Sequence, residues 1–284
     1  MNSRVERIDF HGLRAWRLAV GEAASVVITA QGAQVVSWTS ADGRERLFLS
    51  SRSRFAAEAA IRGGIPVVFP QFAATGPLPR HGFARTADWE LAGTAANGTC
   101  ASVVFHLHDN DSTRGLWPAS FCAEIKVQLG VSSLRVALSV SNTGDAAFAF
   151  SAALHTYLRV TDIEAAFIDR LHGCAYRHGA AGDTLATQAD QRLRIFGEVD
   201  RIYLDAPPTA LLHDGANALA ITRANFPQTV VWNPGAQRSA MLDDMEPDGW
   251  RSMLCVEAAL IDPMVTLEPG GSWTGWQRLE ACDP

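Results

Sequence analysis

The chain has 284 residues, of which 48% are hydrophobic and 19% are charged, and its formal net charge is -6. This composition is typical of a soluble globular protein, and the acidic balance argues against a nucleic-acid partner or an anionic membrane surface. The 5 cysteines are scattered and contain no C-x-x-C pair, the N-terminal residues do not resemble a signal peptide, and no apolar run reaches the roughly 20 residues of a membrane span. We therefore expect a cytoplasmic protein without a disulfide framework.

Alternation of apolar and polar residues with a period of 2 is the main pattern along the chain. Strands are expected at 15–20, 25–29, 34–39, 46–49, 88–92, 101–108, 148–158, 210–212, 218–222, 229–232, 253–261 and 273–279, with a hairpin over 121–141. Turn residues such as Asp42-Gly43 and Asn97-Gly98 separate them. Only short helices are expected, around 54–60 and 241–245. The sequence predicts an all-β fold, a large antiparallel sandwich or barrel with few short helices, and one domain over residues 1–284.

The stretch 61–91 has the composition of an ordered loop with a function. Its glycines allow positive φ, while four prolines fix φ and remove backbone donors, so the segment is restricted without being regular. It also collects Arg62, Arg80, His81 and Arg85 in an otherwise acidic chain. Long ordered loops in compact domains are commonly functional. Local arginines can bind a phosphate group whatever the net charge of the protein.

Glu257 lies within a continuous apolar run at 253–261, which is typical of a strand covered on both faces. Burial of a carboxylate there costs several kcal/mol, about 2–7 for an uncompensated polar group, unless the group is paired or protonated. Two interpretations remain open for this residue. It is a catalytic or binding carboxylate, or it forms an ion pair with an interior arginine.

His155 lies in a second apolar segment, with Tyr157 two residues later and therefore on the same face of a strand. A single buried histidine can also be a satisfied core residue. A His and a Glu that are each embedded in an apolar strand match what a general acid and a general base on either side of a pocket require. The two residues together favour the catalytic interpretation.

Weaker candidates lie elsewhere in the chain. His106 and His108 share one face of a strand, but no third metal ligand is evident from the sequence. His172 and His178 flank a loop and are expected in solvent. Asp200 is either a turn residue or a ligand for a sugar hydroxyl. The tryptophans in strands, Trp38, Trp89, Trp232 and Trp273, are expected in the core or in a pocket wall.

Several of these segments together resemble a known family. The segments are Arg62-Gly63-Gly64-Ile65-Pro66, Phe69-Pro70, Arg80-His81-Gly82-Phe83-Ala84-Arg85, Leu154-His155-Thr156-Tyr157, Val199-Asp200-Arg201-Ile202-Tyr203, Val231-Trp232-Asn233-Pro234 and Cys255-Val256-Glu257. Their order and content resemble the hexose-6-phosphate mutarotases, which are the glucose-6-phosphate 1-epimerase branch of the aldose 1-epimerase superfamily. The resemblance extends from about Gly32 to the C-terminus. It implies a large antiparallel β-sandwich similar to galactose mutarotase.

The resemblance also implies a role for each matching residue. His155 is expected to be the general acid, Glu257 the general base, and His81 a contact of the sugar ring. Arg62 and Arg85 are expected to hold the phosphate, and Asp200 a hydroxyl. Arg80 stands where relatives often carry a neutral polar residue, so it either binds phosphate or faces solvent. Ala258-Ala259 stand where relatives usually have a glycine, which could alter the presentation of Glu257.

The expected activity is interconversion of the α and β anomers of a hexose 6-phosphate, glucose 6-phosphate above all, by a monomer without metal or redox cofactor. Two alternatives are the same chemistry on an unphosphorylated sugar and a sugar-phosphate-binding protein without turnover. The arginines of the 61–91 stretch argue against the first alternative. Retention of both His155 and Glu257 argues against the second, because a binding protein needs no acid and base pair.

Overall fold

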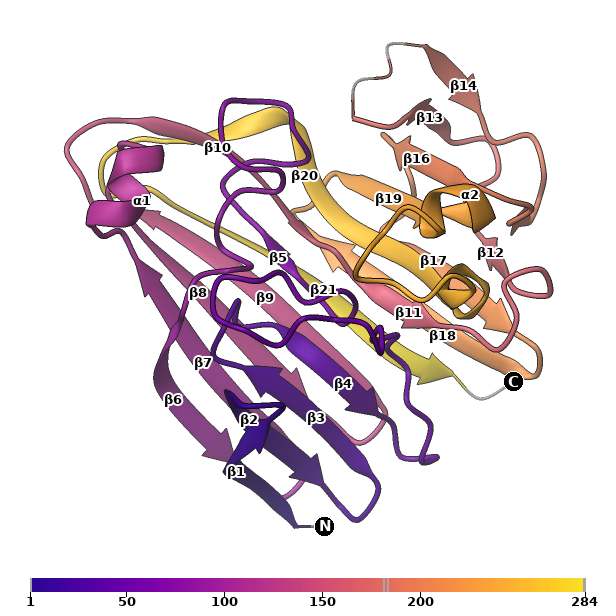
Figure 1. The fold of residues 1–284 in the computed structure, drawn as a ribbon, viewed down its shortest axis with the longest axis horizontal. Helices are drawn as coiled ribbons and strands as arrows, with labels where there is room; N and C mark the ends of the chain where they lie inside the picture. The colour runs from indigo at the N-terminus through magenta and orange to yellow at the C-terminus, as the bar shows by residue number, and fades with distance from the viewer. Residues whose placement is uncertain (1, 181, 183, 283–284) are drawn as a thin grey trace.

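A computed structural model of the chain describes residues 2–180, 182 and 184–282, and its regular structure is almost entirely antiparallel strand (Figure 1). The four-stranded sheet has the order β1 (Ser3–Phe10), β2 (Leu13–Val20), β3 (Ala24–Thr29) and β4 (Val35–Thr39). The eight-stranded sheet has the order β14 (Leu185–Thr187), β13 (Ala175–His178), β16 (Val199–Tyr203), β19 (Gln228–Asn233), β20 (Met253–Leu267), β10 (Phe148–Leu154) and β5 (Val67–Val68), while β11 (Tyr157–Arg159) pairs with β20.

The nine-stranded sheet has the order β15 (Leu193–Arg194), β12 (Phe167–Asp169), β17 (Thr209–Asp214), β18 (Asn217–Ala224), β21 (Ser272–Cys282), β9 (Ser133–Asn142), β8 (Phe121–Leu129), β7 (Ala101–His108) and β6 (Glu90–Ala96). The helices are α1 (Asp111–Leu116), α2 (Gly235–Ser239) and the 3-10 helix η1 (Gly249–Ser252). Among the described residues, no helix has the length and apolar character that a membrane crossing requires.

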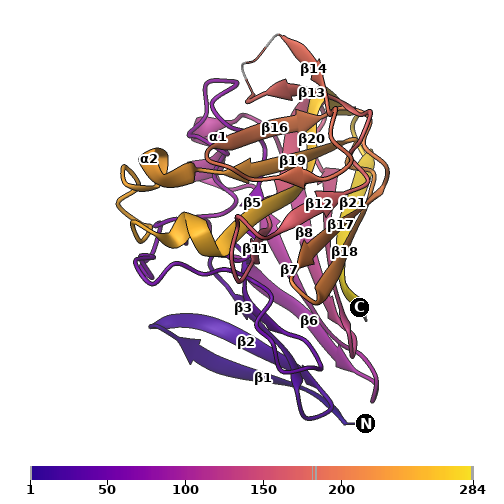
Figure 2. The ribbon, with the colours of Figure 1, turned by 90° about the vertical axis from the view of Figure 1, so that its right-hand side faces the viewer.

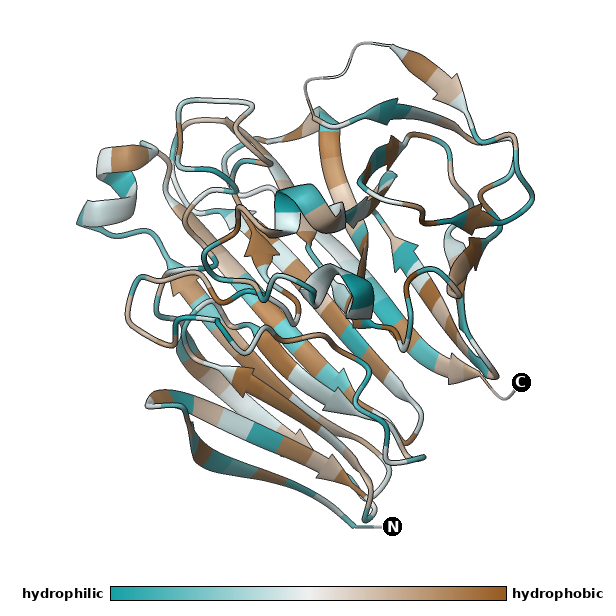
Figure 3. Ribbon diagram, turned by 45° about the vertical axis from the view of Figure 1, so that its right-hand side comes forward, coloured by the Kyte–Doolittle hydropathy of each residue, from teal (hydrophilic) through white to brown (hydrophobic). Residues whose placement is uncertain are grey.

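The sheets form two layers around one large hydrophobic core (Figure 2). The four-stranded sheet lies in the layer of the eight-stranded sheet, because Val35 on β4 bridges Ile65 just before β5. The nine-stranded sheet forms the second layer, and β1 to β3 pack on β6, β7 and β8. Apolar and polar residues alternate along the long strands, as the brown and teal bands of Figure 3 show. This alternation places one face of each strand in the core, and the predicted all-β sandwich is confirmed.

Strand β20 departs from this alternation, because both of its faces are covered over 253–261. Leu254, Val256 and Ala258 point into the core between the layers. Cys255 and Ala259 point the other way, into smaller apolar clusters on the outer side of the eight-stranded sheet. Glu257 is on the same face of the strand as these two residues. Its carboxylate therefore lies outside the main core but is still buried.

Most of the predicted strands are confirmed, including the 121–141 hairpin, which forms β8 and β9 in continuous register. The segment 46–49 makes isolated bridges and not a strand of its own. The strand predicted at 148–158 is interrupted at residues 155 and 156, between β10 and β11. The two predicted helices are wrong: 54–60 and 241–245 consist of turns and bends, and the helices lie at α1, α2 and η1.

Candidate active site

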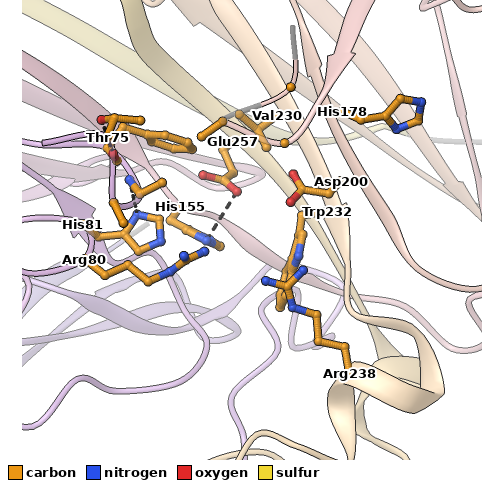
Figure 4. A pocket seen from close by; sticks show the side chains of 16 residues that line it. Thr75, Arg80, His81, His155, His178, Asp200, Val230, Trp232, Arg238 and Glu257 are labelled. Atoms are coloured by element: carbon orange, nitrogen blue, oxygen red, sulfur yellow. Dashed lines mark hydrogen bonds and ion pairs between the residues drawn. The ribbon is translucent and has the colours of Figure 1, made fainter. Parts of the chain in front are cut away.

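A pocket of about 530 Å³ opens on the outer side of the eight-stranded sheet (Figure 4). It is lined by Phe72, Ala73, Ala74, Thr75, Arg80, His81, His155, His178, Gly179, Ala180, Gly182, Asp200, Val230, Trp232, Arg238 and Glu257. Strands form its floor, and the 70–85 loop, the turn after β13 and helix α2 form its rim. Five of the seven site residues predicted from the sequence, His155, Glu257, Asp200, His81 and Arg80, line this one pocket.

Strand register brings the floor residues onto one face. Asp200 on β16 is the partner of Trp232 on β19, and Val230 on β19 is the partner of Glu257 on β20. Residues two apart on a strand share a face, so these four side chains point into the same space. The sheet therefore brings Asp200 and Glu257, nearly sixty residues apart in sequence, to opposite ends of one surface.

The interruption between β10 and β11 sets the position of His155. Its backbone N–H donates to the carbonyl of Pro66 at 3.0 Å, and the N–H of Tyr157 donates to the carbonyl of Gly64 at 2.9 Å. The imidazole stacks on the Tyr157 ring, with centroids 4.8 Å apart and planes 12° apart. The predicted shared face of these two residues is confirmed. The Gly64-Ile65-Pro66 segment thus holds the backbone that presents His155 to the pocket.

His155 and Glu257 form a close pair, with Nε2 of the imidazole 3.4 Å from Oε1 of the carboxyl group. None of the described arginines forms an ion pair with Glu257, so the structural ion-pair interpretation is wrong. Nδ1 of His155 and Oε2 of Glu257 are buried and have no hydrogen-bond partner among the described residues. A satisfied core histidine would not leave Nδ1 unpaired, and such unpaired buried groups call for an explanation such as a ligand.

Burial shifts both members of the pair toward their neutral forms. Loss of solvent, reinforced by the positive side chains of Arg62 and Arg85 and by His81, holds the pKa of His155 well below its usual range. Loss of solvent and the nearby Asp200 carboxylate raise the pKa of Glu257 well above its usual range. Burial therefore favours the neutral imidazole and the neutral carboxyl group over their charged forms.

His81 is fixed as a neutral donor. Its backbone is left-handed, with φ of 69°, and its Nδ1 accepts a hydrogen bond from the N–H of Ala73 at 3.3 Å. Burial, together with the guanidinium groups of Arg85, Arg80 and Arg62, lowers the pKa of His81 to about 3. Because Nδ1 acts as an acceptor, the proton resides on Nε2, which is then free to donate to a ligand oxygen.

The three arginines of the 61–91 stretch surround His81 but differ in their contacts. Arg62 does not line the pocket: its guanidinium forms two bonds of 3.1 and 3.0 Å to Asp244 and a third of 2.9 Å to the Tyr157 hydroxyl. Arg85 does not line it either, and donates to the backbone carbonyl of Arg80 at 2.9 Å. Arg80 does line the pocket, and its side chain has no hydrogen-bond or ion-pair partner among the described residues.

Sequence reasoning did not identify every residue of the pocket. Arg238 on α2 lines it from the side opposite Arg80 and donates to Glu198 at 2.6 Å. His172 and His178 are both exposed, as expected, and His178 also belongs to the rim of the pocket. No local pattern marks Arg238, because α2 is a single turn whose place depends on the preceding strand. Trp232 was expected in the core or a pocket wall, and it lines the pocket at its floor.

Comparison with known proteins identifies the family of this chain. The family model described as "Aldose 1-epimerase" matches residues 14–280 of the chain. The chain belongs to the aldose 1-epimerase family. The residues that line the pocket all fall within the matched range.

Several relatives of this aldose 1-epimerase carry a more specific name. A protein of Cenchrus ciliaris named "Putative glucose-6-phosphate 1-epimerase" is 34% identical over 260 residues, which are 88% of this chain and 79% of the relative. A protein of Escherichia coli K12 with the same name is 31% identical over 241 residues, which are 81% of this chain and 77% of the relative.

Solved structures confirm the fold of this aldose 1-epimerase. The crystal structure of YeaD from Salmonella typhimurium, described as a putative mutarotase, has a TM-score of 0.91 and 25% identity, and the match covers 99% of this chain and 94% of YeaD. A galactose mutarotase-like protein from Clostridium acetobutylicum has a TM-score of 0.76 at 13% identity, covering 100% and 99% of the two chains. The galactose mutarotase-like architecture implied by the sequence motifs is therefore confirmed.

Proposed function

We propose that this aldose 1-epimerase interconverts the α and β anomers of a hexose 6-phosphate, with glucose 6-phosphate as the expected substrate. The observation that carries the proposal is the buried His155 and Glu257 pair, which lines one pocket together with Arg80 and leaves Nδ1 and Oε2 without a hydrogen-bond partner among the described residues. The names of the relatives, glucose-6-phosphate 1-epimerase and mutarotase, support the same substrate and reaction.

The reaction needs one acid and one base at the anomeric centre. Proton donation to the ring oxygen and removal of the proton from the O1 hydroxyl break the C1–O5 bond and form the aldehyde. Rotation about C1–C2 and closure on the other face reverse both transfers, so no net proton is consumed. One transferable proton shared between the two groups is enough for this cycle. Positioned proton transfer of this kind contributes roughly 10²- to 10⁴-fold per group.

We assign His155 as the acid and Glu257 as the base in the substrate complex. In the empty pocket the positive charges of Arg62 and Arg85 oppose protonation of His155. A bound phosphate dianion would offset these charges and so favour the imidazolium and carboxylate form of the pair. His155 can then donate to the ring oxygen while Glu257 accepts the O1 proton. Substrate binding would thus bring His155 and Glu257 into the protonation states that the reaction needs.

The remaining pocket residues divide between the phosphate and the sugar. Arg80 is the free cation on the wall beside His81, and we propose that it contacts the phosphate directly. Arg62 and Arg85 add positive charge behind that wall, and each has to change partners to touch the phosphate itself. His81 Nε2–H is suited to a ring or hydroxyl oxygen, and Asp200, which has space beside Gly179, to a hydroxyl. Binding far from the reacting carbon holds the ring between acid and base.

Exchange spectroscopy by NMR on equilibrated glucose 6-phosphate and on glucose tests the proposal. We expect acceleration of α-to-β exchange for the phosphate ester and little for glucose, above the spontaneous exchange of each sugar. Glu257→Gln and His155→Ala should each abolish the acceleration while retaining ligand line broadening, and Arg62→Ala should chiefly weaken binding of the ester.

Other outcomes point to other functions. Acceleration of glucose alone would assign the protein to unphosphorylated sugars and leave the arginines a structural role. Line broadening without acceleration would identify a binding protein. Full activity of Glu257→Gln would overturn the acid and base assignment.

We further propose that the protein acts in the cytoplasm, where hexose phosphates are made, and as a monomer, since the described pocket is built from one chain.

A further inference from the structure

The outer face of the nine-stranded sheet carries a cluster of metal-binding side chains that the catalytic pocket does not use. Odd-numbered residues of β7 and β8 are buried in the core, so the even-numbered residues point outward. His106 and His108 therefore share this outer face. Register places Glu124 of β8 opposite His106, and Cys122 of β8 opposite His108. The neighbouring strand thus supplies the third ligand that the sequence of β7 lacks.

The ligand atoms lie close together without an ion. One ligand atom from each of His106, His108 and Cys122 lies within 4.8 Å of the others. Cys122 Sγ is 4.0 Å from Nε2 of His108, and Nε2 of His106 is 3.1 Å from Oε2 of Glu124. Tetrahedral zinc, with bonds of about 2.0 to 2.3 Å, keeps its ligands roughly 3.5 Å apart. Small rotations of partly exposed side chains are enough to close this set.

The surroundings favour a cation over a neutral or anionic ligand. Glu90 of β6 is the partner of His106 on the side opposite Glu124, so a carboxylate stands on each side of that imidazole. The donor set combines two nitrogens and one sulfur with a carboxylate. Such a set selects zinc-like ions over Mg²⁺ and Ca²⁺, which prefer all-oxygen sites.

We propose that His106, His108 and Cys122 bind a zinc-type divalent cation on the outer face of β7 and β8, with the Glu124 carboxylate completing a tetrahedral site. The four groups come from two adjacent strands of a continuous sheet, so the backbone is already ordered. None of them lines the catalytic pocket, and the site is independent of the anomer reaction.

Titration of the metal-free full-length protein with Co²⁺ tests this site. We expect one equivalent to produce d–d absorption of tetrahedral type together with a near-ultraviolet thiolate charge-transfer band, and Zn²⁺ to abolish both. Cys122→Ser should remove the charge-transfer band, and His108→Ala should weaken binding by more than the roughly 10- to 100-fold that loss of an outer-shell partner costs. Glu124→Gln should weaken binding while keeping the thiolate band.

Two matched variants provide the control. Cys100→Ser removes another partly exposed thiol, and His172→Ala another exposed imidazole, and both should bind Co²⁺ like the unaltered protein. Two results would overturn the proposal: a charge-transfer band that survives Cys122→Ser, or Co²⁺ spectra of the unaltered protein that lack the band at saturation. Near-ultraviolet circular dichroism establishes that each variant is folded.

Discussion

At the scale of the residue, Glu257 is a buried carboxyl group whose proposed role as the base comes at a cost in stability. Its exposed fraction is 2%, and burial beside Asp200 raises its pKa well above 4.5. The unfolded carboxyl group ionises near pH 4.5. Above that pH the unfolded state binds fewer protons than the folded state, so the free energy of unfolding falls as the pH rises toward the folded pKa. The raised pKa therefore makes the folded protein less stable above pH 4.5 than it would be with an unshifted carboxyl group.

Glu257→Gln should therefore stabilise the protein and inactivate it. The amide is close in shape and never ionises, so we expect no gain in the free energy of unfolding near pH 4. The gain should exceed about 1 kcal/mol at pH 7 to 8, because one pKa unit corresponds to about 1.4 kcal/mol. Urea denaturation at both pH values measures the gain, and the exchange assay measures the loss of activity.

Glu268→Gln is the control, since Glu268 is exposed and makes no side-chain hydrogen bond among the described residues. It should change neither stability nor activity at either pH. An equal gain for Glu257→Gln at pH 4 and pH 8 would show that its effect comes from packing and not from ionisation, and the raised pKa would lose its support.

At the scale of the element, the Gly63-Gly64 pair allows the chain just before β5 to pass close to Val35 of β4 and Tyr157 of β11. Gly64 has φ of 63°, and a Cβ added there would lie 2.0 Å from the carbonyl oxygen of Val35. The carbonyl of Gly64 accepts a hydrogen bond from the N–H of Tyr157, and the N–H of Gly64 donates one to the carbonyl of Phe48. The motif thus serves close backbone approach, and through Tyr157 it fixes the position of His155.

Gly64→Ala should destabilise the protein much more than a glycine replacement in open space. Gly12 also has positive φ, 86°, but no atom lies within 4 Å of its added Cβ. Gly12→Ala should lower the free energy of unfolding only by the cost of a left-handed conformation for alanine, about 1–2 kcal/mol. Gly64→Ala should cost more than twice that amount and lower activity, because the Val35 carbonyl must move. Equal losses in urea denaturation would mean that the close approach is relaxed without cost.

Sequence patterns predicted most of the long elements and missed most of the short ones, and they also missed the eight-residue strand β1. The 121–141 hairpin and the run around Glu257 repeat their pattern over many residues, and both are confirmed. Strands β12 to β15 have two to four residues each, too few to show a period. The 54–60 helix is wrong because Glu58 has φ of 62°, which ends any helical turn. Helix α1, with its Asn110 capping box, was also missed, since its six residues carry no apolar stripe.

Five of the seven predicted residues line the candidate pocket, but their contacts were not predictable from the sequence. His155 and Glu257 were identified because their charge conflicts with their apolar neighbours, which is visible locally. The direction of Arg62 depends on Asp244, 182 positions away in the chain, and no local pattern encodes that pairing. The place of Arg238 on the rim depends on how α2 packs. The roles of Arg62 and Arg85 in phosphate binding stay predictions.

At the scale of the whole molecule, charge is distributed unevenly. The chain has a net charge of -6, yet Arg62, Arg80 and Arg85 are close enough together to lower the pKa of His81. An acidic protein repels a phosphate dianion at long range, whereas this local cluster attracts it within the screening length, about 8 Å at physiological salt.

The single domain predicted for 1–284 is supported by a hydrophobic core to which both layers of sheet contribute, and it remains a prediction.

Binding of a hexose 6-phosphate should therefore depend on salt through the arginines of the pocket wall. We expect Arg80→Gln to raise KM by about 10- to 100-fold with little change in kcat, because a hydrogen bond to a charged group is worth about 1.5–3 kcal/mol. It should also flatten the decrease of kcat/KM between low and physiological salt. Arg192→Gln, which alters an exposed guanidinium over the Phe167 ring, should keep both KM and its salt dependence. A normal KM for Arg80→Gln beside a raised KM for Arg62→Ala would instead assign the phosphate contact to Arg62, and require that this residue leave Asp244 when substrate binds.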